Sequence, residues 1–168
     1  MAGRGPRPLT LGELALAKQA FGNDMPYAQV RLIDGANGNP AAMAAFKNGN
    51  TAITLRRSIY FGPDYRPDFS AAEPHARGLF LHEMTHVRQY ARMGVVRFGI
   101  RYARDMASVR FRASRMYDYE PGVTRFPSAR LEAQAQMVGD YIEAELAGDQ
   151  ERTRLIGESL KGSAVFGL

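Results

Sequence analysis

The sequence predicts an α+β fold in which a small N-terminal β-sheet precedes a mainly helical C-terminal half. Strand-like alternation of apolar and polar residues occurs within residues 27–61, and long helix-compatible stretches fill most of residues 74–160. The order along the chain is therefore helix, strands, then helices. This order is typical of α+β domains.

The first element predicted is a helix over Thr10–Phe21. Thr10 and Glu13 have the spacing of a capping box, in which each side chain satisfies a backbone N–H at the start of a helix. Glu13 also interrupts the apolar stretch that a secretory signal would need. We therefore expect residues 1–8 to form a flexible arm and residues 9–168 to form one domain.

Two strands are expected next. Tyr27–Ile33 alternates in polarity, and a turn-rich segment, 34–40, follows it. Residues 41–50 are ambiguous. Thr51–Phe61 predicts a second strand, which could lie at the edge of the sheet and pair with an extended peptide.

Helices are expected over most of the remaining chain. The segment from Pro74 to Met93 predicts an amphipathic helix that Gly94 ends, and Val95–Met116 predicts another helix. Ser128 has the position of an N-cap for a long helix to about Ala147, after which a shorter C-terminal helix is expected.

The composition is that of a globular protein, with 45% hydrophobic and 23% charged residues among 168. No apolar run approaches the roughly 18 residues that a membrane span needs. Without such a run or a secretory signal, a cytoplasmic location is expected. The chain has no cysteine, which leaves histidine and carboxylate side chains as metal ligands.

Arginines are concentrated in one part of the chain. Eight of them lie between Arg88 and Arg115, where Asp105 is the single acid. Such a cluster can bind nucleic acid, but no nucleic-acid-binding motif accompanies it. We therefore do not expect nucleic acid as a partner.

A His-Glu-x-x-His motif is the most specific signal in the sequence. His82 and His86 are four residues apart, so on a helix they project from one face and can bind one metal ion. Zinc accepts imidazole nitrogen, and a catalytic zinc site has three protein ligands and one open position. Glu83 has the position of a general base that activates water for peptide hydrolysis.

The third ligand has to come from elsewhere in the chain. A metzincin would have Gly at position 89 and His at position 92, where this chain has Gln89 and Arg92. His75 would lie about 10 Å along the helix axis from His82, which is too far to share the ion. Glu132 is the first choice, because Glu132-x-x-Ala135 resembles the ligand-bearing helix of gluzincins, and Glu120 is the second.

Several residues are candidates for supporting the metal ligands or the transition state. Gln136 and Asp140 follow Glu132 by one and two helical turns and could accept a hydrogen bond from a ligand imidazole. Stabilisation of an oxyanion requires a hydrogen-bond donor. The candidates for this role are Tyr117, Tyr119, Tyr141 and His75.

Three stretches of the sequence resemble a known family. Leu79–Gln89, Leu131–Ala135 and the opening Arg7–Glu13 are similar to Vgr-related proteins of proteobacteria, which resemble small zinc metallopeptidases and peptidase-like domains found beside contractile injection and type VI secretion systems. The chain departs from that pattern at Arg88, where members often have an aromatic residue, and at Gln136, where they often have Glu. The resemblance implies a sheet packed on a zincin-like active-site helix, and a role linked to a secretion apparatus.

The expectation from these observations is a zinc-dependent metallopeptidase of the gluzincin type that acts on a peptide or protein. Zn²⁺ would be its cofactor, and components of a secretion apparatus that delivers it would be its partners. The alternative is a non-catalytic zinc-binding accessory or cargo module, in which the metal stabilises the fold. A fourth protein ligand would favour that alternative.

Overall fold

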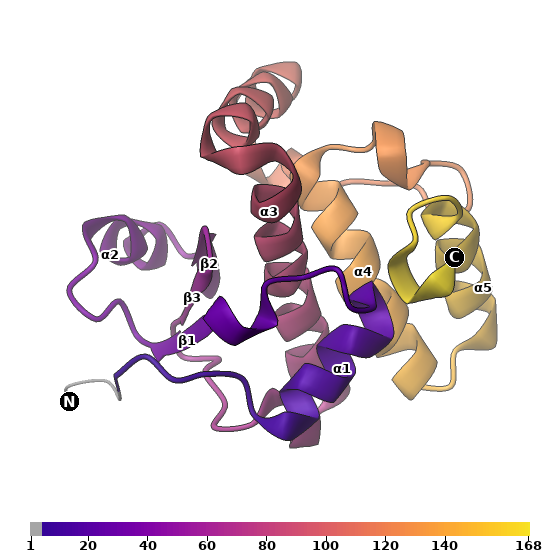
Figure 1. The fold of residues 1–168 in the computed structure, drawn as a ribbon. Helices are drawn as coiled ribbons and strands as arrows, with labels where there is room; N and C mark the ends of the chain where they lie inside the picture. The colour runs from indigo at the N-terminus through magenta and orange to yellow at the C-terminus, as the bar shows by residue number, and fades with distance from the viewer. Residues whose placement is uncertain (1–4) are drawn as a thin grey trace.

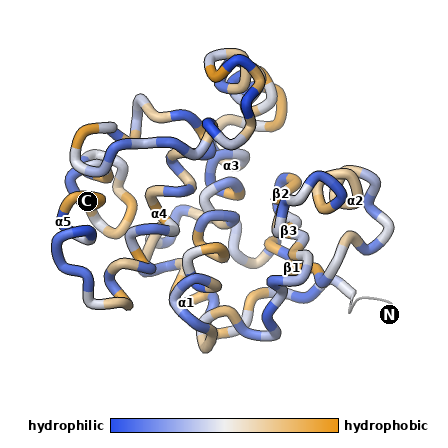
Figure 2. The backbone as a smooth tube through the Cα atoms, turned by 180° about the vertical axis from the view of Figure 1, so that it is seen from behind, coloured by the Kyte–Doolittle hydropathy of each residue, from blue (hydrophilic) through white to orange (hydrophobic). Residues whose placement is uncertain are grey.

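The structure, a computed structural model, describes residues 5–168 and has the predicted α+β fold. A three-stranded sheet lies on one side of a long central helix, α3 (Pro74–Ser108), and α4 (Leu131–Leu146) lies on the other side (Figure 1). Figure 2 shows the same arrangement from behind. The helical C-terminal half is completed by α5 (Gln150–Leu160), which packs on α4.

The first helix, α1 (Leu11–Phe21), has the predicted capping box between Thr10 and Glu13. Glu13 is fully buried, and its carboxylate also binds the Arg7 guanidinium at 2.8 Å and accepts the backbone N–H of Phe69 at 3.0 Å. Arg7 in addition exchanges two backbone hydrogen bonds of 2.9 Å with Leu32. Residues 1–8 are predicted to be a flexible N-terminal segment, but Arg7, near its end, is thus fixed to the domain. Residues 1–4 lie outside the described part.

The sheet has the order β1-β3-β2, with β1 (Arg31–Asp34) parallel and β2 (Ala52–Leu55) antiparallel to the central β3 (Ser58–Phe61). The helix α2 (Pro40–Lys47), capped by Asn39, occupies most of the segment that the sequence left ambiguous. Because β2 ends the strand order, one of its edges faces away from β3.

Two strand predictions need correction. Thr51–Phe61 is a hairpin and not one strand, because the chain reverses at Arg56-Arg57, where Arg56 has a φ of 61°. The strand expected over Tyr27–Ile33 begins only at Arg31, because Tyr27–Gln29 forms a single 3₁₀ turn. The edge strand is consequently β2, half of the segment that was predicted.

The core holds the sheet against α3. Phe61, Phe69 and Phe80 are completely buried. The ring centre of Phe69 lies 4.4 Å from that of Phe61 and 5.6 Å from that of Phe80. Burying aromatic side chains is among the largest stabilising contributions that a residue can make. The contact fixes the first half of α3 beneath the hairpin.

The helix α3 changes direction at Gly94, as the sequence predicts. Gly94 has φ 74° and ψ 165°, a conformation essentially restricted to glycine. The following segment Val95–Ser108, here called the arm, projects from the body of the molecule (Figure 1). The prediction that this helix continues to Met116 is wrong, because Arg110 and Phe111 have positive φ values of 53° and 59°.

The helices α3 and α4 cross closely at two glycines. A Cβ atom on Gly139 of α4 would lie 2.8 Å from the backbone oxygen of Gly78 in α3. The absence of both side chains lets the backbones approach. Further along α3, His82 and His86 pair with Glu132, which precedes Gly139 in α4. Residue numbers therefore rise along α3 where they fall along α4, so the two helices run in opposite directions.

The start of α4 differs from the prediction. Arg130 is the N-cap residue, and Ser128 belongs to a 3₁₀ turn in which its hydroxyl donates to the Arg125 carbonyl. The carboxylate of Asp105, from the arm, accepts the backbone N–H of Leu131 at 2.9 Å and so supplies the missing cap. The arm and the beginning of α4 are therefore tied together.

The arginine-rich segment has mixed surroundings. Arg88 is buried and donates to the Ser163 carbonyl at 2.9 Å, and Arg101 donates to the Ala129 carbonyl at 2.8 Å. These two arginines have structural roles.

Within residues 5–168, no helix has the combination of length and apolar composition that crossing a membrane requires.

Candidate metal centre

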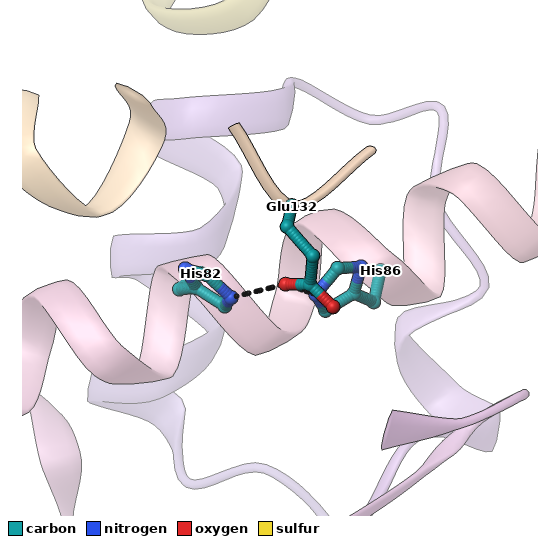
Figure 3. Close-up of side chains that lie close together, drawn as sticks. All are labelled: His82, His86 and Glu132. Carbon is teal, nitrogen blue, oxygen red and sulfur yellow. Dashed lines mark hydrogen bonds and ion pairs between the residues drawn. The ribbon is translucent and has the colours of Figure 1, made fainter. Parts of the chain in front are cut away.

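The structure brings together the three residues predicted as metal ligands. His82 and His86 project from one face of α3, and Glu132 reaches them from the first turn of α4 (Figure 3). Glu132 Oε2 lies 3.2 Å from His82 Nε2 and 3.1 Å from His86 Nε2. All three residues are buried, and their potential ligand atoms lie within 4.8 Å of one another.

These distances fit a tetrahedral zinc ion. Zinc–ligand bonds of about 2.0–2.1 Å place neighbouring ligand atoms of a tetrahedron about 3.3 Å apart. The two measured nitrogen–oxygen separations are 3.2 Å and 3.1 Å. Two imidazoles and a carboxylate also form a donor set that zinc accepts in catalytic sites.

In the metal-free protein, His86 and Glu132 shift each other's pKa values. Burial alone would lower the pKa of His86, but the Glu132 carboxylate outweighs it and raises that pKa to about 9. Burial would likewise raise the pKa of Glu132, whereas the His86 charge and hydrogen bonds from both histidines hold it well below its usual range. Glu132 is therefore ionised at neutral pH, as a carboxylate that holds a metal ion has to be.

Gln89 orients the second histidine, a role that sequence reasoning missed. Its side-chain amide donates to the Leu131 carbonyl at 3.0 Å and to Gln134 Oε1 at 3.1 Å. With both amide hydrogens engaged, Gln89 Oε1 accepts the His86 Nδ1–H at 2.8 Å. The Nε2 atom of His86 consequently faces Glu132 and the metal position.

Gln134 fixes the orientation of Gln89 in turn. The Gln134 amide donates to the Phe126 carbonyl at 2.8 Å and to the Ala129 carbonyl at 3.3 Å, so that its oxygen faces Gln89. The loop before α4 is thus connected to His86 through two buried amides. The sequence signal was Gln89 itself, three residues after His86, but its role depends on the Leu131 carbonyl and Gln134, which are distant in sequence.

Glu83 lies beside the ligand group and lines the adjoining cleft. It is 5% exposed, and the Thr54 hydroxyl of β2 lies 2.7 Å from its Oε2 atom. A hydroxyl at this distance donates a hydrogen bond to the carboxylate and restricts its rotation. Thr54 is a second contact that the sequence pattern did not reveal.

A pocket of about 630 Å³ opens directly at the ligand group. Residues of the hairpin strand β2 and of the arm line it together with His82, His86 and Glu132. A second, smaller hollow of about 280 Å³ shares His82 and Glu83 with this pocket. The candidate site is therefore the centre of an extended cleft.

The expected tyrosines behave differently from one another. Tyr117 lines the cleft and its ring lies 5.9 Å from that of His82. Tyr119 is turned away from the ligands and donates to Asp140 at 2.8 Å, and Tyr141 packs on Phe166. Tyr102, which the sequence analysis did not select, also lines the pocket, where burial and then the nearby Glu132 charge raise its pKa to about 12.

Of the remaining candidates, Gln136, Asp140 and His75 line the smaller hollow beside His82 and Glu83. Gln136 donates to Asp140 at 2.8 Å, and neither residue has a hydrogen bond to a ligand imidazole among the described contacts. Asp140 instead pairs with Arg152 at 3.3 Å. Glu120 is exposed in the loop before α4, and His75 is 76% exposed, 3.5 Å from Glu143.

The fold and the site together define an α+β domain with a buried His-His-Glu group where two helices cross. The chain belongs to the eCIS core domain family, which its residues 8–94 match. That match includes the sheet and the His-Glu-x-x-His helix, and it ends at Gly94. Glu132 and the arm lie outside it.

Two further comparisons concern one protein of Pseudomonas aeruginosa. The chain is 36% identical over 142 residues to the type VI secretion system spike protein VgrG2b. The aligned stretch covers 81% of this chain but 13% of the length of VgrG2b. The solved effector domain of VgrG2b has a TM-score of 0.63 and 28% identity, covering 95% of this chain and 84% of that one. These similarities confirm the Vgr-related part of the predicted resemblance.

Proposed function

We propose that this chain is a zinc-dependent peptidase module of a secretion-system effector. The observation that carries the proposal is the convergence of His82, His86 and Glu132 at distances suited to zinc, with the Glu83 carboxylate beside them at the cleft. A buried ligand set next to a carboxylate and an open cleft is the arrangement that metal-assisted hydrolysis requires.

Each residue has a defined task in this proposal. His82, His86 and Glu132 would hold Zn²⁺, which when bound supplies a Lewis acid for water and for the peptide carbonyl. Glu83 removes a proton from the attacking water and delivers it to the leaving nitrogen. Thr54 keeps the Glu83 carboxylate in one orientation.

Two further elements act on the substrate. The outer edge of β2 offers backbone N–H and C=O groups to an extended peptide, which aligns it along the cleft. The hydroxyl of Tyr117 is a donor for the developing oxyanion, because burial above all raises its pKa and keeps it protonated.

The number of ligands favours catalysis over a structural metal. Among residues 5–168, the group suited to a metal has three members, whereas structural zinc sites are usually closed by four. The fourth position faces a cleft instead of a protein ligand. This supports the peptidase over the non-catalytic module that the sequence left open.

The relatives support the biological setting of the proposal. VgrG2b is named as a type VI secretion system spike protein, and its similar solved domain is named as an effector domain. We extend both descriptions to this chain: it would be delivered by a secretion system and act on a peptide or protein substrate.

Metal content and hydrolysis test the proposal together. Elemental analysis of protein purified without added metal is expected to give about one zinc per chain, which Glu132→Ala loses. Glu120→Ala is the matched control, because Glu120 is exposed and belongs neither to the ligand group nor to the pocket lining, and it should retain zinc.

The zinc-loaded protein is then incubated with a degenerate peptide library. Glu83→Gln is expected to keep its zinc and to lose hydrolysis by about 100-fold or more. A wild-type protein that binds no zinc after reconstitution, or a Glu83→Gln variant that cleaves at the wild-type rate, would contradict the proposal.

A further inference from the structure

The pocket beside the ligand group has a predominantly apolar lining. On the arm it is lined by Val95, Phe98, Tyr102 and Met106, and on β2 by Ile53 and Leu55. The ionisable residues of acidic or basic type in this lining are the ligand group and Glu83. Away from the metal position, the pocket can therefore take an uncharged side chain without stranding a buried charge.

The apolar residues at the rim of the pocket are exposed. Val95 is 51% exposed, and Phe111, three residues after the arm, is 77% exposed. Phe111 has a positive φ of 59°, which is uncommon for a bulky residue. Exposed apolar side chains around a concave apolar surface are typical of a binding site.

Of the described residues, Gly99 is the one glycine in the lining of the pocket. It lies in the middle of the arm helix and lines the pocket, and a Cβ atom built on it would meet no atom within 4 Å. Glycine inside a helix costs about 1 kcal/mol relative to alanine. Neither a positive φ nor a close backbone approach requires glycine here, and its effect is to leave the pocket open.

The strand β2 also lines the pocket, and within residues 5–168 no strand pairs with its outer edge. Side chains of a paired, extended peptide alternate between the two faces of the sheet. Every second side chain of such a peptide would therefore point from β2 toward α3 and the arm, next to the ligand group.

We propose that this pocket binds one large apolar side chain of an extended peptide, and that Gly99 is the residue that sets its size. The identity of the ligand as a peptide rests on the proposed function. The pocket volume of about 630 Å³ is within the range of roughly 300–1,000 Å³ that encloses ligands larger than a single side chain. It has room for the side chain together with the backbone beside β2.

The first test measures peptide binding without metal or hydrolysis. Amide NMR shifts of the chelator-treated, isotope-labelled protein are followed during titration with acetyl-Gly-Gly-Phe-Gly-Gly-amide, and with the same peptide carrying Gly in place of Phe. The Phe peptide is expected to bind about tenfold or more tightly, because burying a phenyl ring is favourable. The shifts should map to β2 and the arm.

Two variants of the arm decide where the preference arises. Gly99→Leu adds a bulky side chain to the lining of the pocket and is expected to abolish the preference for Phe. Ala107→Leu adds a similar side chain on an exposed position of the same helix that does not line the pocket, and it should retain the preference. Thermal unfolding of both variants verifies that they are folded.

A cleavage profile of the zinc-loaded protein separates this inference from the proposed function. The bonds that are cleaved should share a large apolar residue at one fixed position, and Gly99→Leu should change that position to alanine or glycine. Absence of zinc and hydrolysis would overturn the peptidase, while binding of the Phe peptide would still support the pocket. Equal binding of the Phe and Gly peptides, or an unchanged preference in Gly99→Leu, would overturn the inference even if hydrolysis persists.

Discussion

The Oε1 atom of Gln89 lies 2.8 Å from Nδ1 of His86, one turn along the same helix. Gln89 donates its two amide hydrogens to Leu131 and Gln134, so its oxygen, and not its nitrogen, faces His86. His86 therefore carries a proton on Nδ1 and presents Nε2 to Glu132. The loop that precedes α4 therefore influences the ligand geometry of α3.

Replacing Gln89 with alanine should weaken zinc binding without removing a ligand. His86 would lose the partner that orients it, and such losses typically cost 10–100-fold in metal affinity. Competition with a chromogenic chelator measures the zinc dissociation constant. Gln19→Ala, an exposed glutamine on α1, serves as control, and equal affinities of the Gln89→Ala and wild-type proteins would contradict the role.

Thr54→Val tests the contact between β2 and Glu83. The variant keeps the shape of the side chain but removes the hydroxyl 2.7 Å from Glu83 Oε2. Since hydrogen bonds to charged groups contribute about 1.5–3 kcal/mol, kcat/KM for peptide cleavage should fall about tenfold or more, with zinc content unchanged. Thr51→Val, an exposed position beside the same strand, should leave kcat/KM unchanged.

Gly139→Ala should separate α3 from α4. The added Cβ would lie 2.8 Å from the Gly78 oxygen, so the helices must move apart. Allowing for the helix propensity gained by replacing glycine, we expect the free energy of unfolding to fall by about 1–2 kcal/mol and zinc affinity to fall with it. In Gly157→Ala the nearest atom would be 3.6 Å away, and this control should be neutral or stabilised. Chemical denaturation distinguishes the two.

The metal-free protein should become less stable as the pH rises from about 6.5 to 9. The pKa of His86 is raised to about 9 in the folded state, so its pairing with Glu132 stabilises the fold fully below the ordinary histidine pKa of 6.5 and is lost as the pH passes 9. Zinc binding requires His86 to lose its proton, so stabilisation by added zinc should increase over the same range.

Thermal unfolding with and without chelator measures both trends. Glu132→Gln removes the charge that raises the His86 pKa and should flatten the pH dependence of the metal-free protein. A metal-free wild type whose melting temperature rises from pH 6.5 to 9 more than that of Glu132→Gln would contradict the assignment.

Local sequence patterns predicted the elements that depend on local chemistry. The capping box of Thr10 and Glu13, the break at Gly94 and the spacing of His82 and His86 can all be recognised within a few residues. Glu132 is predicted on local grounds too, because it stands near the start of a helix with small Ala135 one turn later. The structure brings it to the two histidines as expected.

The misses arose where distant residues decide the structure. Nothing around Arg56 resembles a usual hairpin turn, which favours Asn, Asp or Gly, so the hairpin was taken as one strand. The N-cap of α4 comes from Asp105, 26 positions before Leu131, and not from Ser128. Gln136 and Asp140 have the expected helical spacing and line the smaller hollow with His82, but Gln136 donates to Asp140, and Asp140 pairs with Tyr119 and Arg152.

The bend at Gly94 has a further consequence for how proteins of this kind can diversify. It lies where the family match ends, so the two histidines and β2 belong to the matched segment, whereas the arm, which lines the pocket with them, belongs to the segment after it. Because the bend interrupts the helical hydrogen bonding between them, the second segment can change in length or direction without rotating the first. One inherited metal-binding helix could thereby be combined with many different recognition surfaces, each supplied by whatever sequence follows the glycine.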